Sequence, residues 1–445
     1  MRLLFFLLLS TFAYGGEVGR KTLSLREFVD FKQVELFSNN INENVAKLVR
    51  EQPSFIRFSL ILDYRIKEVL LYKVDNTTNY LTNENDSVQR QGSIVNYRGC
   101  ISDDVESIAS FTLSDEIIGL ISNSEGNYNI GKYKGSYIVY NDKELKQPEF
   151  LCYAKSITKS VQQPTTASAN NCVNFYWEAD YNIIQDKGSL AAVNTFMTAL
   201  FNQTSTIYAN DGVSVNLKTL YVWTSPSTYY GPYTSDYLDQ FGMDRKIFDG
   251  DLAVLIGFKS AGGIAWIQGL CASQNKYKQA YCGIYNTFKD YPVYSWSVEN
   301  ITHEEGHLLG SNHTHDCIWN GNNTAIDNCG DSAGYGSGCD EKIIPVKGTI
   351  MSYCNLIQSV GVNFSLGFSE QPKKVIQDFI GQSPCLSECT TNVENIKKPV
   401  DKEFTVVEVY DITGKYICKG LLKDMNLSTG VYFLKQGSNI EKHIQ

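Results

Sequence analysis

The chain has 445 residues and a formal net charge of −9, because 48 acidic residues outnumber 39 lysines and arginines. Its 43% hydrophobic and 12% aromatic content is typical of folded domains and excludes a disordered or collagen-like chain, and the length allows two or three domains. The acidic balance, without any basic run, argues against a nucleic acid as partner.

The first 15 residues have the pattern of a signal peptide. Arg2 precedes the apolar run Leu3 to Leu9, and Ala13 and Gly15 are small residues at the two positions that a signal peptidase recognises. We therefore expect residues 1–15 to be removed and the mature chain to be secreted or displayed at the cell surface. No later segment approaches the ~20 apolar residues of a membrane-spanning helix, so no membrane span is predicted.

Residues 16–160 are predicted to form a β-rich domain. The segment contains short β-branched or aromatic runs, separated by clusters of Asn, Asp and Gly that favour turns. These runs are Phe55–Leu62, Glu68–Val74, Ser93–Tyr97, Ser107–Leu113 and Tyr137–Tyr140. A stretch rich in Ser, Thr, Gln and Ala follows without hydrophobic periodicity, so residues 161–170 are predicted to be an exposed linker that a protease can cut.

Residues 171–385 combine strand and helix patterns, which predicts an α+β domain. A helical stripe of apolar residues runs from Leu190 to Phe201. Strand patterns lie at Val173–Trp177, Val213–Trp223 and Asp251–Phe258.

The segment His303 to His313 has the spacing of a catalytic zinc site. Residues four apart lie on the same helix face, so the rings of His303 and His307 can converge on one ion. Gly310 can adopt the left-handed conformation that ends the helix and brings His313 back as a third ligand. Three neutral ligands leave a fourth position for water, and Glu304 can take a proton from that water. The sequence therefore predicts one catalytic Zn²⁺ ion, held by three of the chain's five histidines.

This extended motif resembles that of the metzincin metallopeptidases, and two further segments strengthen the resemblance. Gly348 to Cys354 looks like their Met-turn, with Met351 as an apolar floor beneath the zinc ligands. Gly262 to Trp266 is similar to the edge strand above the active-site cleft in the adamalysin or reprolysin branch. The resemblance covers about residues 171–385 and implies a mixed sheet with helices, split by a cleft whose floor is the zinc helix.

The resemblance also implies an activity, that of a secreted zinc endopeptidase. An extended polypeptide would pair with the edge strand through main-chain hydrogen bonds, and water activated by Glu304 would attack its scissile carbonyl. Tyr353 has the spacing of the tyrosine that astacins and serralysins place on zinc, although packing in the Met-turn is the more common explanation for such an aromatic residue. The alternative function is a catalytically inactive relative that binds a protein or matrix partner.

The chain departs from the adamalysin pattern at the residue after the third histidine. Adamalysins usually have Asp directly after the third histidine, whereas this chain has Thr314 there and Asp316 two residues later. The resemblance to metzincins is therefore closer than the resemblance to the adamalysin branch.

The N-terminal segment also carries a resemblance. Tyr97 to Cys100, followed by Ser107 to Leu120, is similar to the reprolysin-type propeptide, which implies that residues 16–160 inhibit a zymogen. A thiolate from Cys152 or Cys100 could occupy the open metal position. We favour instead a disulfide between these two cysteines, because it leaves no odd thiol, and an acidic side chain could then block the zinc.

The cysteine content as a whole supports an exported protein. Twelve cysteines in such a chain are predicted to form disulfides. Four of them surround the Gly-, Asn- and Asp-rich loop between the zinc helix and the Met-turn, where disulfides would restrain the chain. They are Cys317, Cys329, Cys339 and Cys354.

Residues 390–445 are predicted to form a small β domain. Val406 to Lys415 and Leu427 to Lys435 alternate as strands joined by Gly-containing turns. These segments resemble the C-terminal sorting domain of the Bacteroidetes type IX secretion system, without its Asn-Pro entry segment. The resemblance implies that this machinery carries the protein across the outer membrane, and an accessory β module without a sorting role is the alternative.

Overall fold

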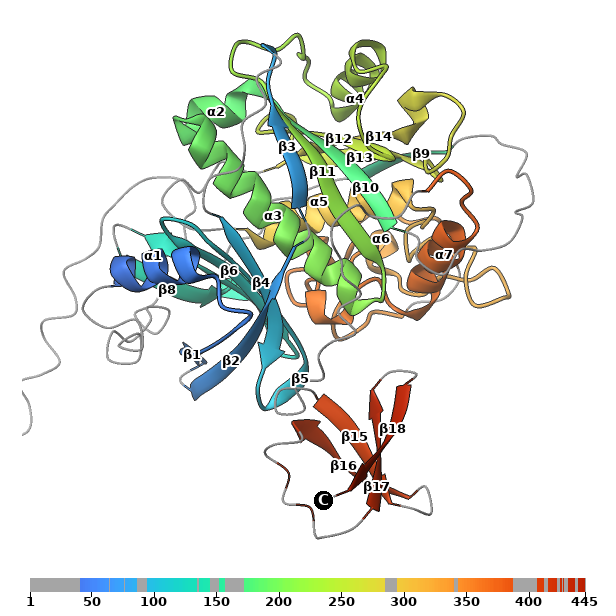
Figure 1. Cartoon of the computed structure of the whole chain (residues 1–445). Helices are drawn as coiled ribbons and strands as arrows, with labels where there is room; N and C mark the ends of the chain where they lie inside the picture. The colour runs from blue at the N-terminus through green and yellow to red at the C-terminus, as the bar shows by residue number, and fades with distance from the viewer. Residues whose placement is uncertain are drawn as a thin grey trace, which may run out of the picture.

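Three β-sheets contain the strands of this computed structural model (Figure 1). The structure describes residues 41–63, 65–75, 77–85, 94–133, 136–144, 152–156, 172–284, 294–339, 343–386, 406–411, 415–421, 425, 427, 431–436 and 439–444. The predicted signal peptide and the predicted linker lie outside the described residues.

The N-terminal sheet is an antiparallel meander whose core is closed by helix α1 (Ile41–Glu51). Val45 and Val49 of this helix pack with Leu71 and Phe111 of the sheet. The strands that the sequence patterns predict in this segment are all present. In sheet order they are β1 (Phe55–Leu62), β2 (Arg65–Val74), β4 (Val95–Ile101), β5 (Asp104–Leu113), β6 (Ile117–Asn123), β7 (Gly126–Tyr133) and β8 (Ser136–Asn141), and the 3₁₀ turn η3 (Asp142–Glu144) follows β8.

The central sheet has seven strands and is mostly parallel. In sheet order they are β3 (Thr77–Thr82), β11 (Ser214–Val222), β10 (Cys172–Ala179), β12 (Leu252–Gly257), β14 (Gln279–Gly283), β13 (Gly262–Ile267) and β9 (Cys152–Ser156). Strand β13 runs antiparallel to β14, and all the other neighbours are parallel.

Helices cover both faces of this sheet, so its strands are apolar on both sides. Phe175 and Trp177 of β10 pack in the larger core beneath the sheet, whereas Tyr176 packs on the opposite face. The larger core is shared by α2 (Tyr181–Lys187), α3 (Leu190–Asn210), α5 (Ser295–Leu308) and α7 (Glu370–Gly381), and the other face carries α4 (Thr234–Asp244). Shorter elements are α6 (Cys329–Ser332), η4 (Asn275–Lys278), η5 (Cys354–Leu356) and η6 (Phe364–Leu366). The described chain is a mixed α+β fold, as predicted.

The N-terminal segment supplies both outer strands of the central sheet. Strand β3 pairs with β11 in the register Leu81 to Leu220, and β9 pairs with β13 in the register Cys152 to Gly263. Leu81 and Cys152 are buried in the same core as Trp177. Helix α3 lies between the central and the N-terminal sheets (Figure 1). The two parts are therefore interleaved, whereas the sequence patterns treat residues 16–160 as a separate unit.

Three disulfides are present among the described residues, and two of them restrain the loop before the Met-turn as predicted. Cys317 pairs with Cys339, and Cys329 with Cys354. The third joins Cys271 to Cys385, near the end of α7. Cys172 is also disulfide-bonded.

The predicted disulfide between Cys100 and Cys152 is wrong, because both thiols are free. Cys100 lies on β4 of the N-terminal sheet, whereas Cys152 lies on β9 at the edge of the central sheet. Cys282 on β14 is the third free thiol among the described residues.

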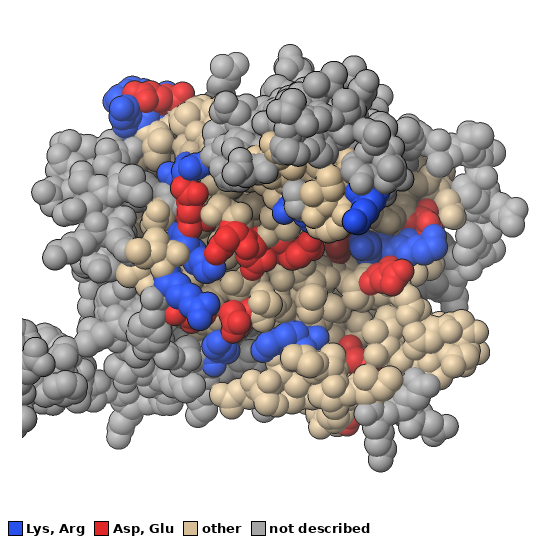
Figure 2. All heavy atoms as spheres, turned by 90° about the horizontal axis from the view of Figure 1, so that it is seen from below, with Lys and Arg blue, Asp and Glu red and all other residues tan. Residues whose placement is uncertain are grey.

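The C-terminal residues form a separate antiparallel sheet, in agreement with the predicted strands. Its order is β16 (Tyr416–Leu421), β15 (Val406–Asp411), β17 (Val431–Gln436) and β18 (Asn439–Ile444). On the face that Figure 2 shows, Asp and Glu side chains gather along the middle, and Lys and Arg side chains lie around them in separate groups without a continuous basic area. Among the described helices, none combines the length and the apolar character needed to cross a membrane.

Candidate active site

Helix α5 presents the first two histidines, and a glycine turn at its end brings in the third. Gly310 has a φ of +103°, a value that favours glycine. Ser311 donates its N–H to the carbonyl of Gly306, and Gly310 donates to that of His307, which is the paired bonding of a Schellman motif. The turn sends the next residues back along the helix end, towards the rings that the helix carries.

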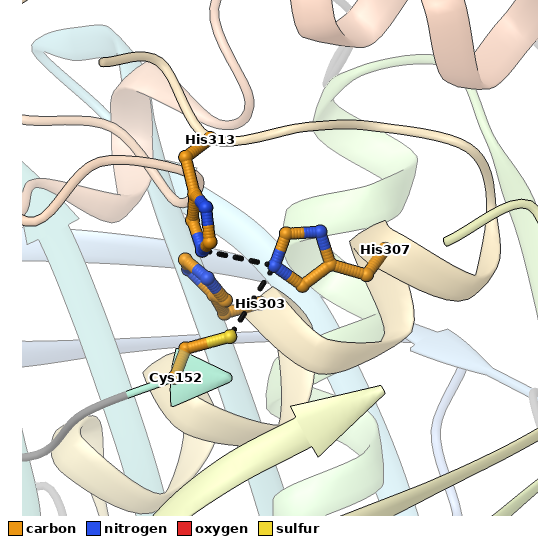
Figure 3. A group of neighbouring side chains, drawn as sticks. All are labelled: Cys152, His303, His307 and His313. Carbon is orange, nitrogen blue, oxygen red and sulfur yellow. Dashed lines mark hydrogen bonds between the residues drawn. The ribbon is translucent and has the colours of Figure 1, made fainter. Parts of the chain in front are cut away.

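The rings of His303, His307 and His313 converge on one point, and the thiol of Cys152 reaches it from strand β9 (Figure 3). The potential ligand atoms of these four residues all lie within 4.8 Å of one another. His307 Nε2 is 3.1 Å from His313 Nε2 and 3.3 Å from Cys152 Sγ. The three histidines of the sequence motif lie together, and Cys152 lies beside them. Sequence patterns indicate Cys152 with Cys100 as a possible thiol ligand, although they favour a disulfide between the two.

This arrangement fits a zinc ion. Nitrogen ligands about 2.0–2.1 Å from a tetrahedral zinc ion lie roughly 3.3 Å apart, close to the separation found here. His303 Nδ1 lies 2.6 Å from the carbonyl oxygen of Ile350, and His307 Nδ1 lies 2.8 Å from that of Ser311. Such bonds protonate Nδ1 and leave Nε2 free to bind a metal.

Burial also favours neutral imidazoles. Burial lowers the pKa of His307 to about 4, and burial with neighbouring histidines holds the pKa of His303 and His313 well below the usual value. Three neutral nitrogens and one sulfur form a donor set that zinc accepts.

Glu304 projects from helix α5 onto strand β13, beside the converging ligands; β13 is not the edge strand that the sequence predicts, because β9 pairs with its outer side. It is fully buried, and burial raises its pKa to about 8. A Cβ atom built on Gly263 would be 2.1 Å from Glu304 Oε1, so the carboxylate rests directly on that glycine. The sequence patterns identify the strand, but they do not identify Gly263 as the residue that makes room for Glu304.

Glu305 points elsewhere, as its position around the helix predicts. Its Oε1 accepts a hydrogen bond of 2.9 Å from Trp177 Nε1, in the core beneath the sheet. Burial raises its pKa well above the usual value. Glu305 therefore belongs to the packing of the helix rather than to the ligand cluster.

The Met-turn lies against the same helix. A Cβ atom on Gly306 would be 2.6 Å from Met351 Sδ, so the glycine within the histidine motif permits this close packing. The Tyr353 hydroxyl donates a 2.5 Å hydrogen bond to the main-chain carbonyl of Cys152, and its ring packs 4.7 Å from that of His313. Tyr353 thus holds strand β9 beside the ligands, and its predicted role on zinc stays a prediction.

One protein-family model matches this chain, over the segment that contains the histidine cluster. Residues 169–365 match Reprolysin_5, a family model described as metallo-peptidase family M12. The crystal structure of metalloproteinase-II from Bacteroides fragilis is similar with 14% sequence identity and a TM-score of 0.40, over 62% of this chain and 88% of that chain. No curated protein matches this sequence.

Proposed function

We propose, from the premise that residues 169–365 form a metallopeptidase domain of family M12, that this protein is a secreted zinc endopeptidase made as a zymogen. The cluster of His303, His307, His313 and Cys152 carries this proposal. Three of its members suit a catalytic zinc site, and the fourth comes from a strand that precedes the peptidase domain.

The proposed chemistry uses the buried carboxylate of Glu304. His303, His307 and His313 would hold the zinc through Nε2. Bound zinc polarises a carbonyl and lowers the pKa of a coordinated water. Glu304 would accept a proton from that water and pass it to the leaving amine. Its seat against Gly263 supports this role, because the carboxylate lies between the ligands and the strand where a peptide would bind.

Extended polypeptides are the proposed substrates. Strand β13 has β14 on one side, and β9 pairs with its other edge. A peptide that replaced β9 could form main-chain hydrogen bonds with the same edge and would lie beside the histidine cluster. We propose that β9 occupies the substrate position until it is removed.

Cys152 supports a specific form of latency. A thiolate at the fourth position would turn a three-histidine site into a closed, four-ligand site without room for water. The hydrogen bond from Tyr353 to the Cys152 carbonyl and the pairing of β9 with β13 would fix the sulfur there. Release of β9 would therefore open the metal position and the peptide-binding edge together.

The contact between the N-terminal sheet and the peptidase domain has an apolar part, in which Ile108 and Leu120 join the peptidase core, and a polar part that suits an interface that must separate. Asn202 of α3 donates a 3.0 Å bond to the carbonyl of Phe111. Arg98 donates 3.0 Å bonds to Ser205 and Thr206 of the same helix. Such side chains remain compatible with water when the N-terminal sheet leaves.

A second polar contact involves the start of α5 and the segment after the Met-turn. Asn127 donates a 2.8 Å bond to the carbonyl of Val362 and a 3.0 Å bond to Asp142. Asp142 is buried with Lys347 and Glu299 in its electrostatic surroundings. Burial raises the pKa of Asp142 to about 6, so this contact should depend on pH.

The decisive experiment compares Cys152→Ser with Cys100→Ser in the full chain. Both cysteines are free thiols of the N-terminal segment, but only Cys152 lies at the histidine cluster. Because β9 still pairs with β13 in both variants, we expect Cys152→Ser, which lacks the sulfur at the metal position, to begin cleaving a peptide substrate at a lower urea concentration than wild type, and Cys100→Ser to behave as wild type. Addition of Glu304→Gln, or a chelator, should abolish that cleavage. Equal latency of the two cysteine variants would contradict the proposed role of Cys152.

The alternative is a binding module without catalysis. It would be favoured if the protein, cut within residues 161–170, bound zinc stoichiometrically but never cleaved denatured protein. Loss of zinc binding in His303→Ala would still be expected in that case.

Export is proposed on sequence grounds alone. The signal-peptide pattern and the C-terminal β domain suggest delivery through a type IX secretion system. Fusion of residues 390–445 to a reporter tests this in a host that has the system. Surface delivery would support sorting, and retention in the periplasm would contradict it.

A further inference from the structure

The three histidine rings differ in what faces their Nδ1 atoms. His303 and His307 have neutral main-chain carbonyl oxygens at 2.6 and 2.8 Å. His313 Nδ1 instead faces a carboxylate, with Asp316 Oδ2 3.8 Å away. That distance is too long for a hydrogen bond, and because the His313 ring is neutral, the carboxylate acts on the dipole of its Nδ1–H group.

The Asp316 carboxylate is held in place from both sides. Its Oδ2 accepts a 3.0 Å bond from the main-chain N–H of His313, and its Oδ1 accepts a 2.9 Å bond from the Ser337 hydroxyl. The disulfide between Cys317 and Cys339 joins the two chain segments right beside these residues. The carboxylate therefore cannot turn away from His313 without breaking these two hydrogen bonds.

Thr314, the residue directly after the third histidine, contacts the Met-turn. Its main-chain N–H and its hydroxyl both donate to the carbonyl of Met351, at 3.0 and 3.3 Å. Thr314 thus joins the segment of the third histidine to the Met-turn, while the acidic group two residues later faces the ring.

We infer that Asp316 is a positioning residue for His313, and this rests on the proposed function, in which His313 binds zinc. A fixed negative oxygen on the Nδ1 side favours the tautomer with Nδ1 protonated, which leaves the Nε2 lone pair for the metal. The bond to the main-chain N–H of His313 also fixes the backbone from which the ring projects. Asp316 therefore acts on the metal through the third histidine.

The test compares Asp316→Asn and Asp316→Ala with Asp327→Asn in the full chain. Asp327 is a buried aspartate of the same loop whose carboxylate accepts a 3.0 Å bond from the Cys329 N–H, and its charge acts on His315 rather than on one of the three predicted ligands. Competition with a chromogenic chelator gives the zinc affinity. The ligand-field absorption of the Co²⁺-loaded protein reports the geometry of the histidine ligands, which a purely structural defect would not alter.

We expect Asp316→Ala to weaken zinc binding by about 10- to 100-fold and to change the cobalt spectrum. Asp316→Asn should fall between wild type and Asp316→Ala, because it keeps the acceptor for the His313 N–H but loses the charge. This isosteric variant also decides the matter if Asp316→Ala fails to fold. Asp327→Asn should keep both zinc affinity and spectrum.

Two results would overturn this inference while leaving the proposed function intact. One is an unchanged affinity and spectrum in both Asp316 variants. The other is an equal loss in Asp327→Asn, which would mean that any disturbance of the loop suffices. Failure of the proposed function looks different, because the wild-type chain would then bind no stoichiometric zinc, or His313→Ala would bind zinc as tightly as wild type.

Discussion

Replacement of Gly263 by alanine tests whether the seat of Glu304 controls catalysis. The new Cβ atom would be 2.1 Å from Glu304 Oε1 and 2.4 Å from its Cδ. Ordinary non-bonded contacts begin near about 3.4 Å, so the carboxylate must move by roughly 1 Å. Both groups are buried, which leaves the side chain no open solvent to turn into.

A displacement of about 1 Å in a catalytic group can lower the rate by about 100-fold, which corresponds to about 2.7 kcal/mol of transition-state stabilisation. We therefore expect the Gly263→Ala variant to have a kcat/KM about 100-fold lower than wild type on a peptide substrate. Both proteins are measured after cleavage within residues 161–170. Zinc content should stay at wild-type level, because the three histidines are untouched.

The matched control is Gly381→Ala, at the end of α7, where a new Cβ atom meets nothing within 4 Å. This variant should keep its activity and its thermal midpoint. The reasoning would be refuted if Gly263→Ala kept kcat/KM within about threefold of wild type while folding normally, because the clash would then have been absorbed without moving Glu304.

Three further predictions concern stability and docking. The pKa of Asp142 is about 6 in the folded protein, against an ordinary value of 3.8. Its contribution to the free energy of unfolding is therefore complete below about pH 4 and is lost as pH rises through 6. Wild type should lose about 3 kcal/mol more than Asp142→Asn between pH 4 and 7.5 in denaturant unfolding, and parallel curves would contradict this. Removal of the disulfide between Cys329 and Cys354, 25 residues apart, should lower the free energy of unfolding by about 3.5 kcal/mol, and a loss below about 1 kcal/mol would refute the chain-entropy argument. Asn202→Ala should weaken the binding of the cleaved N-terminal segment to the peptidase domain by about 1–3 kcal/mol, because it removes the bond to the Phe111 carbonyl. Activity should then appear at a lower urea concentration, and an unchanged midpoint of that urea curve would count against this contact.

The histidine cluster is predictable because its information is local. The spacing of His303, His307 and His313 depends on helix periodicity and one glycine turn, and both are visible in sequence. The strands are predictable for the same reason, since apolar alternation is a property of short segments.

Features that depend on distant partners are not predictable in this way. Counting cysteines favours a bond between Cys100 and Cys152, yet their strands lie in different sheets. Nothing in the segment around Leu81 shows that β3 pairs with β11, because strand patterns do not specify a partner. The role of Gly263 depends likewise on a side chain from helix α5.

The origin of both outer strands has a consequence for how the protein folds and for how it can be produced. Strands β3 and β9 cover the edges at β11 and β13, where unpaired main-chain groups would otherwise invite pairing between molecules. The N-terminal segment would thus act as an intramolecular chaperone, and a peptidase domain synthesised from residue 171 onward should aggregate unless that segment is supplied. Pairing of β3 with β11 also joins residues far apart in sequence, so the sheet should close slowly, and late in folding.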